Sequence, residues 1–212
     1  MVGRQRRDGR RKVDVEERRA RLAEIAAQVW GCTQCRLCAS RRVAVPGEGP
    51  LDAPLVWVGE APGKSEDATG RPFVGASGAF LRREMAEAGI APESVFITNV
   101  VKCRPPANRQ PRADEIAICT GLYLIRQVEL TRPGGLVALG ATAAGALLAG
   151  PVKVTEEHGA WRRDYDLTGQ DLAVFVTYHP AAAIRSDRWR EELRADLRRL
   201  AEWLDTHGYP RR

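Results

Sequence analysis

Four continuous apolar runs are distributed along the chain, at residues 55–58, 95–101, 136–139 and 172–176. A strand that is covered on both faces reads as an unbroken apolar run, as in parallel sheets. Successive runs are far enough apart for an intervening helix, because a strand–helix–strand unit takes about 30 or more residues. The pattern therefore predicts one α/β domain with a mainly parallel sheet, whose ligands would bind beyond the carboxyl ends of the strands.

Apolar positions at helical spacing predict helices beside these strands. The first helix is expected to begin at Asp14, because Asp14 and Glu17 form a capping pair, and to end at Gly31. The other helices that the pattern predicts lie at 77–89, 112–131, 141–149 and about 188–206. No internal repeat is evident.

The basic residues are concentrated at the N-terminus. The 212 residues include 33 Lys and Arg against 27 Asp and Glu, a formal net charge of +6. Residues 1–12 hold six basic residues and one acidic residue, whereas the other 200 carry 27 basic and 26 acidic residues. We expect residues 1–12 to be a disordered arm, either a solvated tail or a non-specific phosphate-binding arm. Residues 13–212 would form a single domain, in which a polyanion site must be a local patch.

Neither export nor membrane insertion is indicated. No apolar segment follows the basic N-terminus, as a secretory signal would require. Residues 133–152 lack charge and are long enough for a membrane span, but five glycines interrupt them, which is typical of strand, turn and short helix. We expect a cytosolic, monomeric protein without membrane contact.

The five cysteines indicate a metal site rather than disulfides, because the cytosol keeps thiols reduced. Cys32 and Cys35 form a Cys-x-x-Cys pair, and Cys103 and Cys119 follow singly. Four thiolates can bind zinc, which normally uses two tight pairs, or an iron–sulfur cluster, which tolerates looser spacing. Buried free thiols are the remaining alternative. Cys38 is a fifth cysteine that could replace Cys35 as a ligand.

Three of the four predicted strands end in polar residues that would share one edge of the sheet. The first is followed by a Gly-rich loop with three carboxylates and one aromatic residue, at 59–75. The second ends in Thr98-Asn99, and the fourth in Thr177-Tyr178-His179. Because the carboxyl ends of parallel strands lie together, this coincidence predicts a polar binding site there.

These motifs resemble the iron–sulfur class of uracil-DNA glycosylases, called family four. The resemblance covers nearly the whole chain from about Cys32 to the last predicted helix. It rests on GEAPG at 59–63 with Glu66-Asp67, GRPFVG at 70–75, TNVVKCRPP at 98–106, LGATA at 139–143 and YHPA at 178–181. It implies a three-layer α/β/α sandwich around a four-stranded parallel sheet. It also implies a structural [4Fe–4S] cluster bound by Cys32, Cys35, Cys103 and Cys119.

The family's activity is to flip uracil out of DNA and hydrolyse its N-glycosidic bond, leaving an abasic site. By resemblance, Phe73 would stack on the base, although it could be an ordinary core aromatic. The Asn99 amide would pair with uracil O4 and N3–H and reject cytosine. His179 would hydrogen-bond O2 as negative charge develops, unless it is a structural histidine. Glu66 would exclude the thymine methyl group, or alternatively open a helix or form a surface ion pair.

No strong general base is evident for the attacking water, because Ala61 stands where uracil glycosylases outside this class carry an aspartate. The resemblance assigns water or backbone positioning to Glu60, with help from Asn108, and places Ala61 and Gly63 in the base pocket. Residues expected to contact DNA are Lys102, Arg104 and Arg109 at backbone phosphates, with Ile184 as a wedge in the duplex.

Three other functions stay open. Some covalent uracil-DNA-binding relatives carry a basic insert ending in histidine, and residues 102–108 contain none, which favours turnover. A non-catalytic, metal-stabilised nucleic-acid-binding protein would not need His179. An iron–sulfur electron carrier would not need Phe73, Asn99 and His179 around one pocket. Strand breakage at uracil after alkali would distinguish the enzyme from these alternatives.

Overall fold

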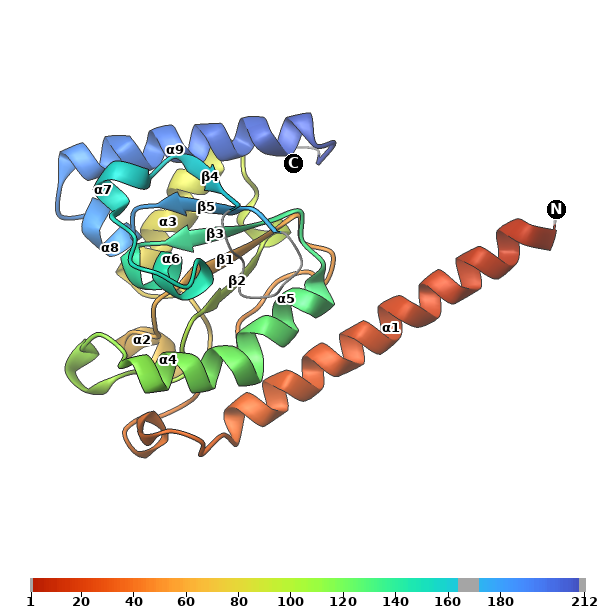
Figure 1. Cartoon of the computed structure of the whole chain (residues 1–212), viewed down its shortest axis with the longest axis horizontal. Coiled ribbons are helices and arrows are strands. Elements are labelled where there is room, and N and C mark those ends of the chain that lie inside the picture. The colour runs from red at the N-terminus through yellow and green to blue at the C-terminus, as the bar shows by residue number, and fades with distance from the viewer. Residues whose placement is uncertain (1, 164–171, 210–212) are drawn as a thin grey trace.

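The computed structural model describes residues 2–163 and 172–209, with side chains from residue 14 onward. Within these residues the centre is a five-stranded sheet in the order β2-β1-β3-β5-β4 (Figure 1). β2, β1, β3 and β5 run parallel, which confirms the four predicted strands. The strands are β1 (Leu55–Gly59), β2 (Phe96–Asn99), β3 (Gly135–Leu139), β4 (Ala160–Arg162) and β5 (Val174–Thr177).

β4 is an antiparallel edge strand that the apolar pattern did not predict. It pairs with β5, with Ala160 opposite Val176 and Arg162 opposite Val174. The three residues of β4 are exposed or half-buried. They therefore lack the continuous apolar run by which the buried strands are recognised.

One face of the sheet is covered by α1 (Val2–Trp30), α5 (Ile125–Thr131) and α6 (Ala141–Leu147). Val56 and Val58 of β1 point to this face and share an apolar core with residues of all three helices. Successive residues of a strand point to opposite faces, so β1 contributes its other side chains to a second core.

The opposite face is covered by α3 (Ala76–Glu87) and α9 (Asp187–Thr206). Leu55 and Trp57 of β1 pack there against Leu81 of α3 and other residues of both helices. The chain is thus an α/β/α sandwich, as the resemblance implied.

Short helices and turns make the connections. The predicted helix at 112–131 consists of α4 (Ala113–Cys119), a π-helical turn (Thr120–Leu124) and α5. The other short helices are α2 (Lys64–Thr69), α7 (Val154–Glu157) and α8 (Pro180–Ala183), with 3₁₀ turns at Arg36–Ala39, Pro92–Ser94 and Pro106–Asn108.

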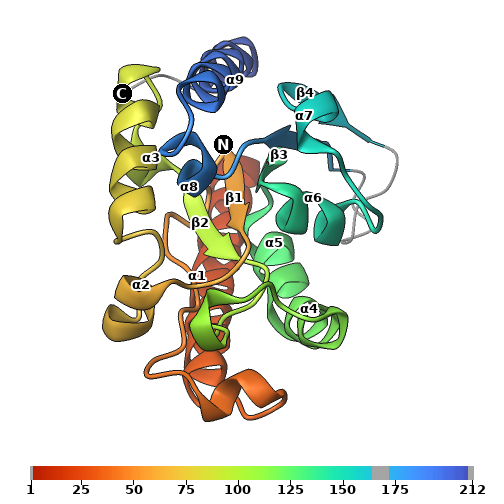
Figure 2. The ribbon, with the colours of Figure 1, turned by 90° about the vertical axis from the view of Figure 1, so that its left-hand side faces the viewer.

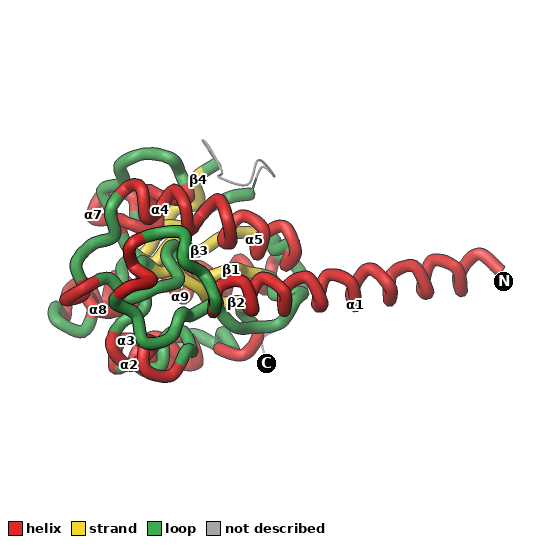
Figure 3. The backbone as a smooth tube through the Cα atoms, turned by 90° about the horizontal axis from the view of Figure 1, so that it is seen from below, coloured by secondary structure: helices red, strands yellow, loops and turns green. Residues whose placement is uncertain are grey.

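α1 extends further toward the N-terminus than we predicted. The helix continues through residues 2–12, which we expected to be a disordered arm, and it does not begin at the Asp14 capping pair. Asp14 instead accepts a hydrogen bond from Arg132 at 2.8 Å. Arg, Lys and Gln have high helix propensity, so a helix that the domain holds at its C-terminal half can extend through them. Figures 1 and 3 show this extension projecting away from the sheet.

The uncharged segment 133–152 contains β3 and α6 rather than a membrane span. None of the helices in the described part of the chain is long and apolar enough to cross a membrane.

Candidate active site and cysteine cavity

The segments that follow β1, β2 and β5 enclose a cavity of about 260 Å³ at the carboxyl ends of these strands. Figure 2 looks onto this edge of the sheet. The predicted site residues that line the cavity are Glu60, Ala61, Gly63, Glu66, Phe73, Asn99, Asn108, Arg109 and His179. Three segments that are distant in sequence therefore meet at one site, as the strand-end pattern predicted.

Phe73 occupies a restrained position on the cavity wall. Its ring centroid lies 6.3 Å from that of His179. Its φ of 52° is unusual for a residue other than glycine and is held by the surrounding structure. A Cβ on Gly78 would lie 2.0 Å from the Phe73 carbonyl oxygen, so only glycine lets α3 pack this closely.

Gly59 separates Phe73 from Asn99. A Cβ at this position would lie 2.5 Å from Asn99 Oδ1 and 2.6 Å from Phe73 Cζ. Asn99 is the last residue of β2 and is only 2% exposed. The aromatic ring and the carboxamide thus lie on either side of a glycine that has room for no side chain.

His179 is held in one protonation state. It caps the N-terminus of α8, where its Nδ1 accepts a hydrogen bond from the Ala181 backbone N–H at 3.1 Å. Burial lowers the pKa of His179 to about 4. The imidazole is therefore neutral at pH 7, and because Nδ1 is an acceptor, the ring proton lies on Nε2.

The Glu66 carboxylate is occupied by backbone N–H groups. Its Oε2 accepts from Gly63 at 3.1 Å, and its Oε1 accepts from Val74 at 2.9 Å and Gly75 at 2.7 Å. Gly63 and Gly75 are the N-caps of α2 and α3, so Glu66 opens one helix and secures the loop before the next. The helix-opening alternative is confirmed, and Glu66 also lines the cavity.

A hydrogen-bonded chain that we did not predict orients Glu60. Thr142 Oγ1 donates to Glu60 Oε2 at 2.5 Å, and Gln110 Nε2 donates to Thr142 Oγ1 at 3.1 Å. Thr142 lies in the LGATA motif, and this motif was the only feature of the sequence that pointed to the hydrogen-bonded chain. No feature of the sequence singled out Gln110.

Lys102 is enclosed within the protein, so its ammonium group is not available for the phosphate contact that we predicted. Its side chain is only 1% exposed, and its Nζ donates to Thr98 Oγ1, the Asn99 carbonyl oxygen and Gln127 Oε1. A phosphate cannot reach an ammonium group that is enclosed in this way.

Arg104 and Arg109 both make side-chain hydrogen bonds within the protein. Arg109 makes two hydrogen bonds to the carboxylate of Glu115, at 2.6 and 2.8 Å, and these bonds hold the pKa of Glu115 at about 2. Arg109 therefore neutralises a buried carboxylate, and its phosphate contact stays a prediction. Arg104 Nε donates to Asn108 Oδ1 at 2.7 Å and so fixes the Asn108 amide.

The rim of the cavity next to α8 combines an apolar and a basic side chain. Ile184 is 40% exposed at the end of α8, as a wedge would require. The next residue, Arg185, lines the cavity, as does Ser77 near the start of α3. Sequence reasoning missed both of these, because neither stands at a strand end.

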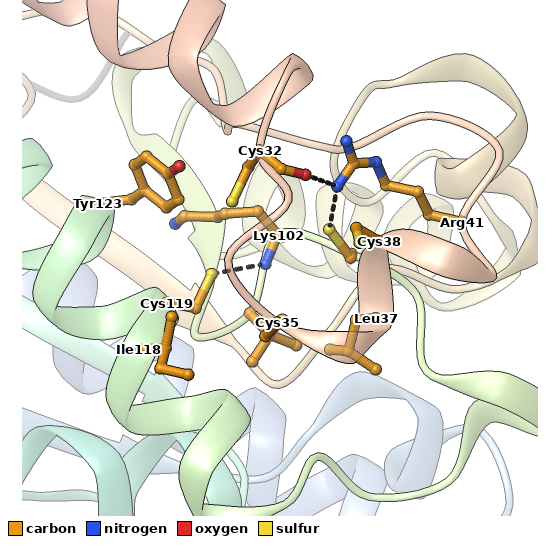
Figure 4. Close-up of a pocket in the computed structure, with 11 residues that line it drawn as sticks. Cys32, Cys35, Leu37, Cys38, Arg41, Lys102, Ile118, Cys119 and Tyr123 are labelled. Carbon is orange, nitrogen blue, oxygen red and sulfur yellow. Dashed lines mark hydrogen bonds between the residues drawn. The ribbon is translucent and has the colours of Figure 1, made fainter.

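A second cavity is lined by all five cysteines (Figure 4). Cys32 and Cys35 follow α1, Cys103 follows β2, and Cys119 ends α4. Cys38 lies on the 3₁₀ turn after Cys35. Cys103 and Cys119 are buried, and the other three are half-buried.

The surroundings of the thiols suit bound thiolates. Arg41 Nη1 donates to Cys103 Sγ at 3.2 Å, and the Lys102 backbone N–H donates to Cys119 Sγ at 3.2 Å. Burial raises the pKa of Cys119 to about 12 and also raises that of Cys103, so a metal would have to displace protons. Within the described residues, no three Cys, His, Asp or Glu side chains are grouped around a single-ion site.

Comparisons with known proteins agree with this arrangement. A model of the uracil DNA glycosylase superfamily matches residues 46–203. The chain is 42% identical over 186 residues to a type-4 uracil-DNA glycosylase of Saccharolobus solfataricus, with 86% of each chain covered. It is 41% identical over 194 residues to a type-4 uracil-DNA glycosylase of Thermotoga maritima, covering 90% of this chain and 98% of the relative.

A type-5 uracil-DNA glycosylase of Pyrobaculum aerophilum is 31% identical over 175 residues, with 74% of each chain covered. The type-4 proteins thus share more identical positions with this chain, over more of its length. On these matches, the chain belongs to the uracil-DNA glycosylase superfamily and, within it, to the type-4 class.

Proposed function

We propose that this protein removes uracil from DNA by hydrolysing its N-glycosidic bond, which releases free uracil and leaves an abasic site for repair. The observation that carries this proposal is that Phe73, Asn99 and His179 line one cavity, although they come from three segments that are distant in sequence. A base must leave the duplex to reach such a cavity, at a cost of a few kcal/mol that stacking and edge hydrogen bonds offset.

Recognition of uracil follows from the chemistry of the wall. The Phe73 ring offers a stacking face, and such contacts contribute about 1–3 kcal/mol per base. The Asn99 amide donates to uracil O4 and accepts from N3–H, and cytosine presents the opposite polarity at both positions. Glu66, whose oxygens are held by three backbone N–H groups, is a fixed wall against the thymine methyl group.

Bond cleavage gives an oxocarbenium-like sugar and a uracil that carries negative charge. The neutral His179 directs Nε2–H to uracil O2, where this charge develops. A preorganised donor of this kind typically contributes about 10²–10³ in rate. No proton transfer from His179 is needed, because uracil leaves as an anion.

Glu60 positions the attacking water or the pocket backbone. The hydrogen bond from Thr142 uses Glu60 Oε2, and the Asn108 amide, fixed by Arg104, lies on the same cavity wall. Because residue 61 is an alanine, this position supplies no carboxylate beside Glu60 and Asn108. Catalysis therefore depends mainly on stabilising the leaving anion and the sugar cation.

The DNA strand would lie across the rim of the cavity. Arg185 and the exposed edge of Arg104 supply positive charge for backbone phosphates. Ile184 would enter the space that the flipped nucleotide leaves.

The cysteine cavity would hold a [4Fe–4S] cluster through Cys32, Cys35, Cys103 and Cys119. When bound, the cluster supplies four iron–thiolate bonds and no step of the reaction. Four thiolates spread around a cavity, with N–H donors to two of the sulfurs, suit a cluster better than a single zinc ion.

The proposal is tested with duplex oligonucleotides that carry uracil, thymine or cytosine at one position. After incubation with the protein and treatment with alkali, strand breakage is expected only at uracil. Breakage at thymine would remove the assigned role of Glu66, and no breakage at uracil would refute the proposed function.

A further inference from the structure

The ammonium group of Lys102 is buried, and each of its three protons has a hydrogen-bond acceptor. Its Nζ lies 2.7 Å from Thr98 Oγ1, 2.8 Å from the Asn99 carbonyl oxygen and 2.7 Å from Gln127 Oε1. Burial of an ammonium group is costly unless its protons are bonded, and here all three have an acceptor. The position of the ammonium is therefore fixed by its three partners.

These partners belong to two different elements. Asn99 ends β2, whereas Gln127 lies on α5 and is itself only 2% exposed. Gln127 Nε2 also donates to the Pro46 carbonyl oxygen at 2.7 Å, which limits its own movement. Lys102 thus joins the main chain of Asn99 to a side chain that the helix holds in place.

The backbone of Lys102 faces the cysteine cavity. Its N–H donates to Cys119 Sγ (Figure 4). The next residue in the chain is Cys103. Lys102 therefore contacts the cysteine cavity through its main chain, and it contacts Thr98 and Asn99 of β2 through its side chain.

We propose that Lys102 is a positioning residue for uracil recognition, which clamps the main chain of Asn99 to Gln127 of α5. This inference rests on the proposed function. Lys102 does not touch the base, so its effect passes through the Asn99 carboxamide.

The test variant is Lys102→Met, which keeps the length of the side chain and removes the ammonium. We expect single-turnover uracil excision to fall at least about tenfold, because a misplacement of about 1 Å can cost 10²-fold in rate. Inhibition by free uracil should weaken to a similar degree. Binding of abasic DNA and iron content per chain should be unchanged, which a general loss of structure would not allow.

The matched control is Thr131→Val. Thr131 is fully buried on α5 and donates to the Gln127 carbonyl oxygen at 2.6 Å, but it does not contact the ammonium. This variant loses a buried hydrogen bond next to the clamp and should excise uracil at the wild-type rate.

A second variant, Gln127→Met, removes the other end of the clamp and should show the same fall in excision. Iron-loaded Lys102→Met or Gln127→Met protein that excises uracil and binds free uracil like wild type would overturn the proposal. Loss of iron from both variants would assign Lys102 to the cysteine cavity alone and would also overturn it. If the wild-type protein releases no uracil, the proposed function itself fails, which is a different result.

Discussion

At the scale of single residues, backbone restraints place Phe73, Asn99 and His179, the groups proposed to contact the base. Gly59 and Gly78 have no space for a Cβ, and each gap admits a part of Phe73. The hydrogen bond from the Ala181 backbone N–H to Nδ1 fixes the tautomer of His179. The pocket is therefore fixed before a base enters, which is what stabilisation of a developing charge requires.

The close approach at Gly59 gives a first prediction. In Gly59→Ala the new methyl group would displace Asn99 Oδ1 or the Phe73 ring, so uracil excision should fall at least about tenfold. The control is Gly121→Ala, where nothing lies within 4 Å of the added Cβ. Single-turnover assays of both variants measure the effect, and equal rates would contradict the assigned geometry.

The protonation state of His179 gives a second prediction. Burial lowers its pKa to about 4, below the value of about 6.5 in an unfolded chain, so protons favour the unfolded state. The neutral imidazole persists as the pH falls, until about pH 4. Uracil excision should therefore show no inflection near pH 6.5 in single-turnover assays. An inflection there that disappears in His179→Asn would refute a neutral histidine donor.

The sequence predicted which strand-end residues meet at the cavity, but not the buried partners of the basic residues near it. Asn99 and His179 stand at strand ends, and a parallel sheet brings such positions together. Lys102 and Arg109 also lie near a strand end, but their roles depend on Gln127 and Glu115, buried partners on other helices. Local charge in a sequence does not reveal such partners.

At the scale of elements, long buried segments were predictable and short ones were not. The parallel strands and α9 carry continuous or periodic apolar patterns. β4 is a three-residue edge strand, and α8 is a four-residue helix that begins after His179. β4 forms by pairing with a distant strand, and α8 forms next to its capping residue. Both elements are too short to show a periodic pattern of apolar residues in the sequence.

The proposed cluster would join α4 to the loops after α1 and β2, which gives a third prediction. Cys119→Ser should lose the visible absorption of the cluster and lower the melting temperature, because α4 would no longer be tied to the loops after α1 and β2. Cys38→Ser is the matched control from the same cavity and should keep both properties. Absorption and thermal melting decide the ligand set, and loss of colour in Cys38→Ser instead would assign that cysteine as a ligand.

At the scale of the whole molecule, α1 separates the basic N-terminus from the active site. A helix of 29 residues is about 43 Å long, and its C-terminal end leads to the cysteine cavity. Figure 1 shows its N-terminal end projecting on the side opposite the carboxyl ends of the strands. The composition identified the positive charge of residues 1–12, but it did not predict the direction in which this segment projects.

Deletion of residues 2–12 gives a fourth prediction. The single-turnover rate at saturating protein should be unchanged, because the segment cannot reach a base in the cavity. Binding to undamaged DNA at low salt should weaken if the segment contacts phosphates. Excision by the truncated and full-length proteins measures the first effect, and a fall of tenfold or more would show that the segment serves the active site.

The central claim is that one cavity holds uracil and stabilises it as it leaves. Its most direct test is the single-turnover rate of uracil excision by wild type and His179→Ala, with binding to abasic DNA measured beside it. We predict a fall of about 10²–10³ in the rate with unchanged binding, because only the donor to the leaving base is lost. A variant that excises uracil as fast as wild type would contradict the account.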